Sequence, residues 1–300
     1  MVHTVTIIFH GIVLREAVPS IPAQPIGKKG VPMKRFQLAV RPLILSLFLL
    51  FSAGCRLPSA GPTEAAAIQI STVEALLENI GPGANLQLEP GYYNLSTYVQ
   101  QLQQAGTLED WNLAHPHVQL QPVVDGVQVE IYNADGLTIA GASPYRADAH
   151  LVIDPRYGNV LTFCDCSGLL LENLTLGHTE TGNCMGDVLS FYGDCSGRLR
   201  NLDLYGCGVW GISIFDGAVS LSLEDTLIRD CYSGPYFISA VQSGKIAFSD
   251  CQFIGSQRAG FINWDICGCD VEFTSCAFGA GESAARLDRL ANYQNCVWTP

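Results

Sequence analysis

Short segments with alternating hydrophobic and polar residues recur along the second half of the chain. Five of them align with one another: LLLENLTL (169–176), GRLRNLDL (197–204), LSLEDTLI (221–228), IAFSDCQF (246–253) and VEFTSCAF (271–278). They start 28, 24, 25 and 25 residues apart, and each follows a second hydrophobic segment: VLTF (160–163), VLSF (188–191), ISIF (212–215), FISA (237–240) and FINW (261–264). A looser copy is VEIYNADGLTIAG (129–141). A repeat of about 25 residues that contains strands and turns but no helix is typical of a β-solenoid.

The alternation predicts which side chains fill the interior. Strand alternation makes neighbours such as Glu172, Arg200 and Glu224 point outward. We therefore predict an all-β protein, a right-handed parallel β-helix over residues 65–300 with a C-terminal cap. The predicted inward columns are Leu171, Leu199, Leu223, Phe248 and Phe273; Leu176, Leu204, Ile228, Phe253 and Phe278; and Phe163, Phe191, Phe215 and Trp264. A polar ladder at the bend, predicted to bond the turn backbone, comprises Asn173, Asn201, Asp225, Asp250 and Ser275.

A β-sandwich or a propeller is the alternative architecture. Both need antiparallel hairpins with close, regular turn signals, which the segments between these strands lack. At the beginning of the domain, Ser71-Thr72-Val73-Glu74 has the form of a capping box that opens a short helix, and Gly81-Pro82 ends it. This helix is predicted to cap the solenoid.

The amino-terminal segment has the layout of an export signal. From Met33 a basic start is followed by an apolar run from Leu43 to Phe51 and by small residues that end at Cys55. This segment (33–54) resembles a lipoprotein signal peptide, which implies that Cys55 is acylated as the lipid anchor. An ordinary secretory cleavage nearby is the alternative. Residues 1–32 are interpreted as an upstream extension before a true start at Met33, and residues 55–64 as a linker.

Composition and charge exclude several partners. The 300 residues are 48% hydrophobic and 15% charged, which is typical of a chain with a large core. The net charge is −12, and six of the 16 lysine and arginine residues lie before residue 55, in the export signal and the segment ahead of it. The remaining body is strongly acidic and is expected to repel nucleic acid and anionic lipid. We expect a monomer.

The 12 cysteines are predicted to be mostly buried thiols. Several fall in columns, such as Cys251 with Cys276 and Cys166 with Cys195, where side chains run parallel and free cysteines pack as small hydrophobic groups. Disulfides between neighbouring strands are the alternative in an exported protein. No zinc-type spacing is present, so we predict no metal site.

The repeat pattern resembles that of bacterial right-handed parallel β-helix proteins, the pectate-lyase-like superfamily. The resemblance covers about residues 65–280 and includes Pro90-Gly-Tyr-Tyr-Asn94 in the first turn. In polysaccharide-active members the substrate groove follows one sheet and its loops. The resemblance therefore implies a groove along the VLTF-type strands, beside the loops 177–187, 205–211, 229–236 and 254–260.

Several residues near this expected groove have side chains suited to carbohydrate chemistry. Asp216 and Asp265 are candidates for the two carboxylates of a glycoside hydrolase, and Arg229 and Arg258 for neutralising a uronate in a lyase. His178 and Glu180, together with Asp187, share the longest loop and suit acid and base work. Each of these is also explained as an ordinary turn or surface residue. Aromatic side chains that would stack on sugar rings are Tyr192, Tyr205, Trp210, Tyr232 and Tyr236.

Two functions follow as hypotheses. The first is an exported, lipid-anchored protein of the cell envelope that binds or processes a polysaccharide or other glycan. The second is a non-catalytic envelope or adhesion scaffold. Whether the protein is an enzyme is left open; a lyase would need Ca²⁺ or arginine, and no other cofactor is expected.

Overall fold

The computed structural model describes residues 66–180, 185–206, 209–255, 268–279 and 291–299, together with three short strands outside these ranges. The chain divides into two compact units, Met1–Ser59 and Ala60–Pro300. In the first unit, β1 (Ile7–Phe9) pairs antiparallel with β2 (Ile12–Leu14). The predicted signal peptide (33–54) and the anchor Cys55 lie outside the described residues. In the described part of the chain, no helix is long and apolar enough to cross a membrane.

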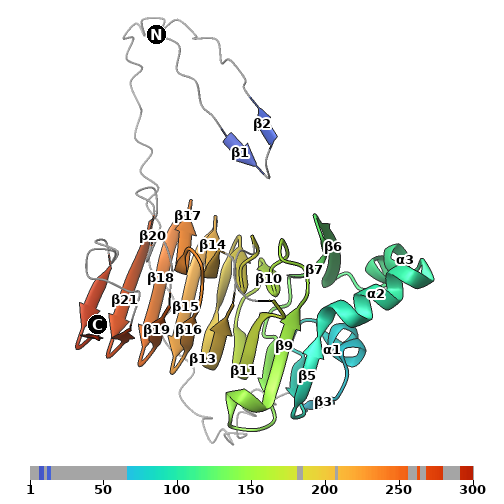
Figure 1. Ribbon diagram of the computed structural model, residues 1–300, viewed down its shortest axis with the longest axis horizontal. Coiled ribbons are helices and arrows are strands. Elements are labelled where there is room, and N and C mark those ends of the chain that lie inside the picture. Colours follow the sequence, from blue (N-terminus) through green and yellow to red (C-terminus); the bar gives the residue numbers. More distant parts are fainter. Residues whose placement is uncertain are drawn as a thin grey trace, which may run out of the picture. The chain divides into compact units, whose positions relative to one another are not determined.

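The second unit is a parallel β-helix, as predicted (Figure 1). One wall is a seven-stranded sheet in which all described pairs are parallel except the β6–β7 hairpin. Because parallel pairing between successive turns dominates, the sandwich and propeller alternatives are wrong. The strands of this sheet are β6 (Val118–Val123), β7 (Gly126–Tyr132), β10 (Leu161–Cys164), β12 (Leu189–Tyr192), β14 (Trp210–Phe215), β17 (Gly234–Ser239) and β20 (Ile262–Asn263).

The other two walls belong to one fifteen-stranded sheet that bends along its length. Two long strands, β11 (Leu169–His178) and β13 (Cys195–Tyr205), run through the bend and join both walls. The first wall, here called the first limb, also contains β3 (Ile68–Ile70), β4 (Asn85–Leu88), β8 (Thr138–Gly141), β15 (Ala218–Glu224), β18 (Ser243–Ser249), β21 (Cys269–Thr274) and β23 (Asn292–Gln294). The second limb contains β5 (Gly91–Asn94), β9 (Ala149–Ile153), β16 (Leu227–Arg229), β19 (Gln252–Ile254), β22 (Ala277–Phe278) and β24 (Val297–Trp298).

Columns of stacked apolar side chains form the core. Phe248 lies 4.7 Å from Phe273 between ring centroids, and Phe253 lies 5.0 Å from Phe278, with nearly parallel rings in both pairs. Phe163 stacks on Phe191 in the seven-stranded sheet. The two predicted inward columns of the fifteen-stranded sheet are confirmed, because every member is buried.

The third predicted column is wrong at Phe215. Strand β14 pairs with β12 so that Ile214, not Phe215, lies beside Phe191. Phe215 lies beside Tyr192 and faces outward. A shift of one residue moves every side chain of a strand to the opposite face of its sheet. The shared serine in LSFY (189–192) and ISIF (212–215) marks the correct alignment, since Ser190 pairs with Ser213. Trp264, the last member of that column, lies outside the described residues.

The polar ladder occupies the bend between the two limbs, where its members share a left-handed backbone conformation. Asn173, Asn201, Asp225, Asp250 and Ser275 all have φ between +46° and +56°. This left-handed conformation is strained for most residues but accessible to asparagine and aspartate. The Asn201 amide also donates to the Asn173 side-chain oxygen at 2.8 Å. The ladder therefore turns the chain at the same point on each successive turn.

Helices and a hairpin cover the end of the solenoid that holds the first strands (Figure 1). The predicted capping helix is α1 (Val73–Asn79), whose N-cap is Thr72, one residue after the predicted position, with its side chain accepting from the Ala75 N–H. Two further helices, α2 (Leu95–Ala105) and α3 (Leu108–Ala114), were not predicted. The Asn112 side chain of α3 bonds both the N–H and the carbonyl of Leu120 in the edge strand β6. This contact occupies backbone groups that an edge strand otherwise exposes to other chains.

The described cysteines are free thiols, which confirms the predicted preference over disulfides for these residues. Cys251 and Cys276 each donate to a strand carbonyl of the neighbouring turn, Leu223 and Phe248 respectively, both at 3.5 Å. Burial raises the pKa of Cys195 to about 11, so its thiol stays protonated at neutral pH. The thiols therefore act as small core side chains.

Substitutions at Asp250 test the requirement for a left-handed residue. Asp250→Val is expected to lower the free energy of unfolding by about 1–3 kcal/mol, because a β-branched residue is strained at this φ of +54°. Asp250→Gly is expected to change it by less than about 0.5 kcal/mol. Urea unfolding followed by circular dichroism gives both values. Equal stability of the two variants would contradict the role assigned to the ladder.

Candidate functional site

A row of aromatic side chains lies on the outer face of the seven-stranded sheet. Tyr192 stacks on Phe215, with ring centroids 4.7 Å apart, and Phe215 lies 5.5 Å from Phe237. Phe237 in turn stacks on Trp210 at 5.3 Å. Tyr192 is 36% exposed, and the other three are partly buried. We call Tyr192, Trp210, Phe215 and Phe237 the aromatic row.

The row continues toward a polar group on β7 and β10. The Tyr132 hydroxyl donates to one carboxylate oxygen of Glu130, and the Gln128 amide donates to the other at 2.7 Å. Strand register places Tyr132, Cys164 and Tyr192 side by side on consecutive turns. Burial, followed by the nearby charges of Asp187 and Glu130, raises the pKa of Tyr192 to about 12. The phenol therefore remains a hydrogen-bond donor at neutral pH.

The buried side chain of Asp187 stabilises the backbone of the aromatic row. Its carboxylate accepts the backbone N–H of Trp210 at 3.0 Å and the Ser190 hydroxyl at 3.4 Å, and Ser190 bonds Ser213 at 2.7 Å. The carboxyl is buried, and this desolvation raises its pKa to about 6 despite the hydrogen bonds, which act in the opposite direction. Asp187 thus fixes the backbone that carries Trp210.

The three titratable residues predicted from the longest loop each interact with different partners. His178 is 1% exposed, and its Nε2 donates to the carbonyl of Gly158 at 2.8 Å, whereas its Nδ1 has no partner among the described residues. Glu180 is exposed and forms an ion pair with Arg156. Asp187 bonds the aromatic row instead. The predicted acid and base grouping of His178 with Glu180 is therefore not seen, because one is a buried core residue and the other a surface ion-pair partner.

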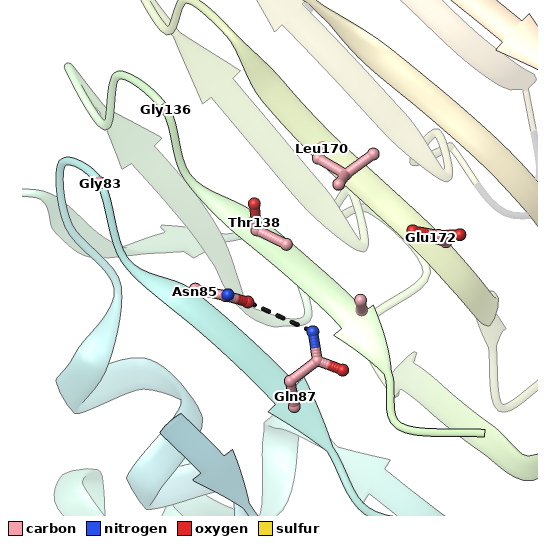
Figure 2. Close-up of a pocket in the computed structure, with 8 residues that line it drawn as sticks. Gly83, Asn85, Gln87, Gly136, Thr138, Leu170 and Glu172 are labelled. Carbon is pink, nitrogen blue, oxygen red and sulfur yellow. Dashed lines mark hydrogen bonds between the residues drawn. The ribbon is translucent and has the colours of Figure 1, made fainter. Parts of the chain in front are cut away.

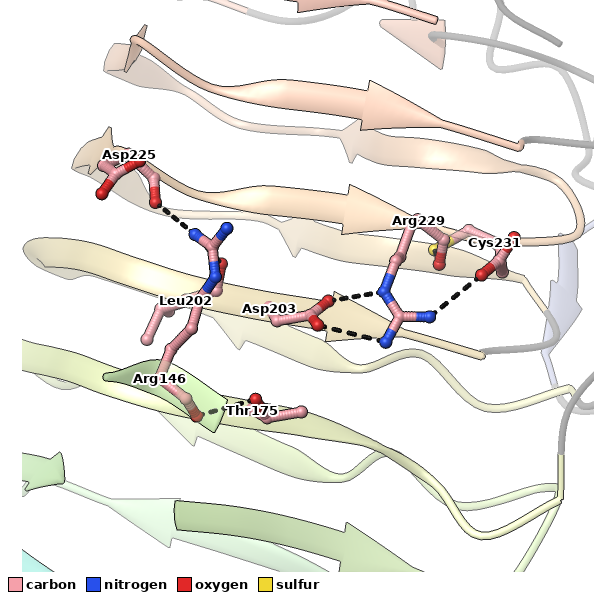
Figure 3. A network of polar contacts seen from close by, with 8 residues as sticks. Arg146, Thr175, Leu202, Asp203, Asp225, Arg229 and Cys231 are labelled. Carbon is pink, nitrogen blue, oxygen red and sulfur yellow. Dashed lines mark hydrogen bonds and ion pairs between the residues drawn. The ribbon is translucent and has the colours of Figure 1, made fainter. Parts of the chain in front are cut away.

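Arg229 pairs with Tyr205 in the fifteen-stranded sheet, whereas the aromatic row lies on the seven-stranded sheet. Figure 3 shows Arg229 and the polar contacts around it. The guanidinium of Arg229 forms a bidentate pair with Asp203 at 2.9 and 3.1 Å, contacts Asp230 at 3.1 Å, and lies 4.7 Å from the centre of the Tyr205 ring. Its charge is already neutralised by these partners. Beside it, Arg146 donates to the bend carbonyls of Leu202 and Asp225, which ties a loop across neighbouring turns.

The remaining residues predicted to line the groove lie in turns, in the core or outside the described part of the chain. Asp216 is an exposed turn residue with φ of +59°, equivalent in register to Asp165 and not to Tyr192. Tyr236 is 1% exposed and packs against Phe248 and Phe273, so it presents no ring to a ligand. Tyr232 is partly buried in the turn before β17. Asp265 and Arg258 lie outside the described residues.

A separate hollow of about 260 Å³ lies on the outer face of the first limb (Figure 2). It forms because the small side chains of Thr138 and Ala140 lie between longer ones on the neighbouring strands β4 and β11. Gln87 donates to Asn85 at 3.2 Å along one side. The hollow contains no aromatic side chain. In the described ranges, no group of three or more His, Cys, Asp or Glu residues is arranged to hold a metal ion.

Comparison with known proteins adds little to this picture. No protein-family profile matches the chain, and no curated protein matches it. Among solved structures, the chain is similar to a pectate lyase variant from Xanthomonas campestris, with 10% sequence identity and a TM-score of 0.29, over 78% of this chain and 79% of that one. The assignment as a parallel β-helix rests on the strand register described above.

The buried carboxyl of Asp187 is expected to make stability depend on pH. Its pKa is about 6 in the folded protein and about 3.9 in an unfolded chain, so the folded state binds the proton more tightly. The resulting stabilisation is present below about pH 4 and is lost as the pH rises through 6. Asp187→Asn keeps the acceptor for Trp210 and does not titrate. Relative to wild type, this variant should gain about 1–3 kcal/mol between pH 4 and 7, measured by chemical unfolding; a constant difference would contradict the burial of a titrating carboxyl.

His178 is expected to act in the opposite direction. Burial lowers its pKa, so protonation in acid disfavours the folded state. The stability that depends on a neutral His178 is present above about pH 6.5 and is lost as the pH falls toward its folded-state pKa. His178→Gln retains a donor for the Gly158 carbonyl without titrating. Wild type should therefore lose stability relative to this variant between pH 7 and 5, and parallel thermal unfolding curves for the two proteins would contradict the assignment.

Proposed function

We propose that the protein binds carbohydrate along the aromatic row of the seven-stranded sheet. The observation that carries this proposal is the row itself: four aromatic side chains on consecutive turns face away from the core. Nothing in the packing of the interior requires aromatic residues at these outward positions. Partly exposed apolar groups in a contiguous row are typical of a binding surface.

The chemistry of the row suits a sugar. Aromatic rings offer apolar surface to the C–H face of a pyranose, and a tyrosine hydroxyl supplies a polar edge. Tyr192 is the most exposed member, and the polar pair of Tyr132 and Glu130 lies nearby for hydroxyl groups. A rigid sheet also holds such groups without an ordering cost on binding.

Binding without cleavage is the function that the surroundings favour. Asp187 accepts several hydrogen bonds that hold the local backbone, and the pKa of Cys164 is raised to about 12, chiefly by burial. The Cys164 thiol is therefore not poised as a nucleophile, and the Asp187 carboxylate is buried and engaged in holding the backbone. We include export and lipid attachment at Cys55 in the proposal, on the basis of the signal-like sequence before it. A lipid-anchored β-helix of this kind would present its row to glycans of the cell envelope.

Tyr192→Ala and Trp210→Ala are expected to weaken glycan binding at least tenfold each, because each removes a ring from the row. The measurement is a glycan array with the full-length protein, followed by calorimetry on the glycans that bind. Tyr145→Ala is the matched control, since Tyr145 is a highly exposed tyrosine on the loop between β8 and β9.

Two results would count against the proposal. If a broad array yields no binding glycan, the scaffold hypothesis becomes the better account. If glycans bind but Tyr145→Ala weakens binding as much as Tyr192→Ala does, the ligand lies elsewhere on the surface.

A further inference from the structure

The outer face that carries the aromatic row has a strongly negative charge pattern. The strands β6, β7, β10, β12, β14 and β17 contain no lysine or arginine. Their outward side chains include the carboxylate of Glu130, and Asp187 lies beside Ser190. The turns that follow these strands add Asp135, Asp165, Asp194 and Asp216.

Backbone donors hold several of these carboxylates in place. Asp165 accepts the N–H of Asp194 at 3.0 Å, and Asp194 accepts the N–H of Ala218 at 2.7 Å. The hydroxyl and N–H of Ser167 both bond Asp135 and lower the pKa of its carboxyl. Successive turns therefore place carboxylates at the same end of the strands of this sheet.

Most of the described basic side chains on the other walls pair with a carboxylate. On the first limb, Arg200 pairs with Glu172, Arg198 with Glu224 and Lys245 with Glu272. Arg229 is held by Asp203 on the second limb, and Arg156 by Glu180. Near Tyr192, by contrast, the negative charges of Asp187, Glu130 and Asp216 all act to raise the pKa of its hydroxyl, and the described strands of this sheet contain no lysine or arginine to offset them.

The two sides of the Tyr192 ring have neighbours of different size. One face of its ring stacks on Phe215, and on the opposite side the register places the short side chain of Cys164. Tyr132 lies one turn further on, so the two tyrosines are separated by roughly 9–10 Å at the backbone. Glu130 lies beside this gap, bonded by Tyr132. An aromatic face and a carboxylate thus border the same short space.

We infer that the glycan bound by the aromatic row carries protonated amino groups, as in an oligomer of non-acetylated glucosamine. This inference rests on the proposed carbohydrate binding and names its ligand class. An ammonium group is attracted both to carboxylates and to the faces of aromatic rings. A uronate polymer would be repelled by the same surface, and a neutral glycan would gain nothing from its charge.

The test compares three ligands of equal length on the full-length protein by calorimetry: a β-1,4-linked glucosamine hexamer, its fully N-acetylated form, and a hexamer of galacturonate. At low salt the glucosamine hexamer is expected to bind about tenfold more tightly than the acetylated form. The galacturonate hexamer is expected to bind more weakly than either. The preference for the amino sugar should shrink severalfold when the salt concentration is raised tenfold, because exposed charges are screened.

Variants that remove single charges test which carboxylates produce the preference for the glucosamine hexamer. Glu130→Gln and Asp216→Asn are each expected to reduce the preference for the glucosamine hexamer at least twofold. Asp225→Asn is the matched control, because Asp225 is also an exposed aspartate with positive φ but lies at the bend between the limbs. Asparagine tolerates this backbone conformation, so the Asp216→Asn variant is expected to fold even if Glu130→Gln does not.

The outcomes separate this inference from the proposed function. Equal binding of the acetylated and non-acetylated hexamers, or a preference for galacturonate, would overturn the charge inference and leave carbohydrate binding intact. An amino-sugar preference that falls equally in Asp225→Asn and Asp216→Asn would also overturn it, because the charge of the whole body would then be responsible. Failure of all glycans to bind would remove the proposed function, and this inference with it.

Discussion

The bend between the two limbs imposes the constraint on which the rest of the structure depends. Each turn of the chain must change direction at the same place if its strands are to pair with those of the turns before and after it. The backbone does so by placing one residue in the left-handed conformation, at Asn173 and Asn201 in the long strands and at Asp225 and Asp250 in later turns. Because that conformation is strained for most residues, the bend selects asparagine, aspartate or serine. The identical geometry of successive bends keeps the stacked columns in register.

Once the register is fixed, the division between core and surface follows. Leucine and phenylalanine columns stack inside at the spacing of neighbouring strands, as the parallel rings of Phe248 and Phe273 show. Residues between them face outward, because successive side chains of a strand point to opposite faces of the sheet. The outward aromatic row is therefore a separate feature of the sequence, because its side chains are not part of the core packing. The described strands of this wall contain no lysine or arginine, whereas strands of the first and second limbs do.

Two buried titratable groups, Asp187 and His178, have pKa shifts of opposite sign. Asp187 has donors for its carboxylate and uses them to hold Trp210, yet burial still raises its pKa. One ring nitrogen of His178 has no partner in the described part of the chain, and burial lowers its pKa. Burial thus disfavours the charged form of both groups, which raises the pKa of the acid and lowers that of the base. The stability of the turns beside the aromatic row is therefore tied to the protonation of two buried groups.

The sequence by itself determined the class of fold, the two columns of the fifteen-stranded sheet and the polar ladder. These follow from local rules, since alternation and turn preferences are visible in the residues themselves. Only the tertiary structure decided the faces of β14 and β17, because a one-residue shift between VLSF (188–191) and ISIF (212–215) leaves both segments equally hydrophobic. That shift brought Phe215 to the outer face beside Tyr192. Arg229 lies apart from them because its strand belongs to the second limb. The burial of Tyr236 was likewise outside the reach of sequence spacing, because it depends on the register that places Tyr236 beside the buried Ile212. His178 ends its strand, where the path of the chain into the next turn decides which way a side chain points.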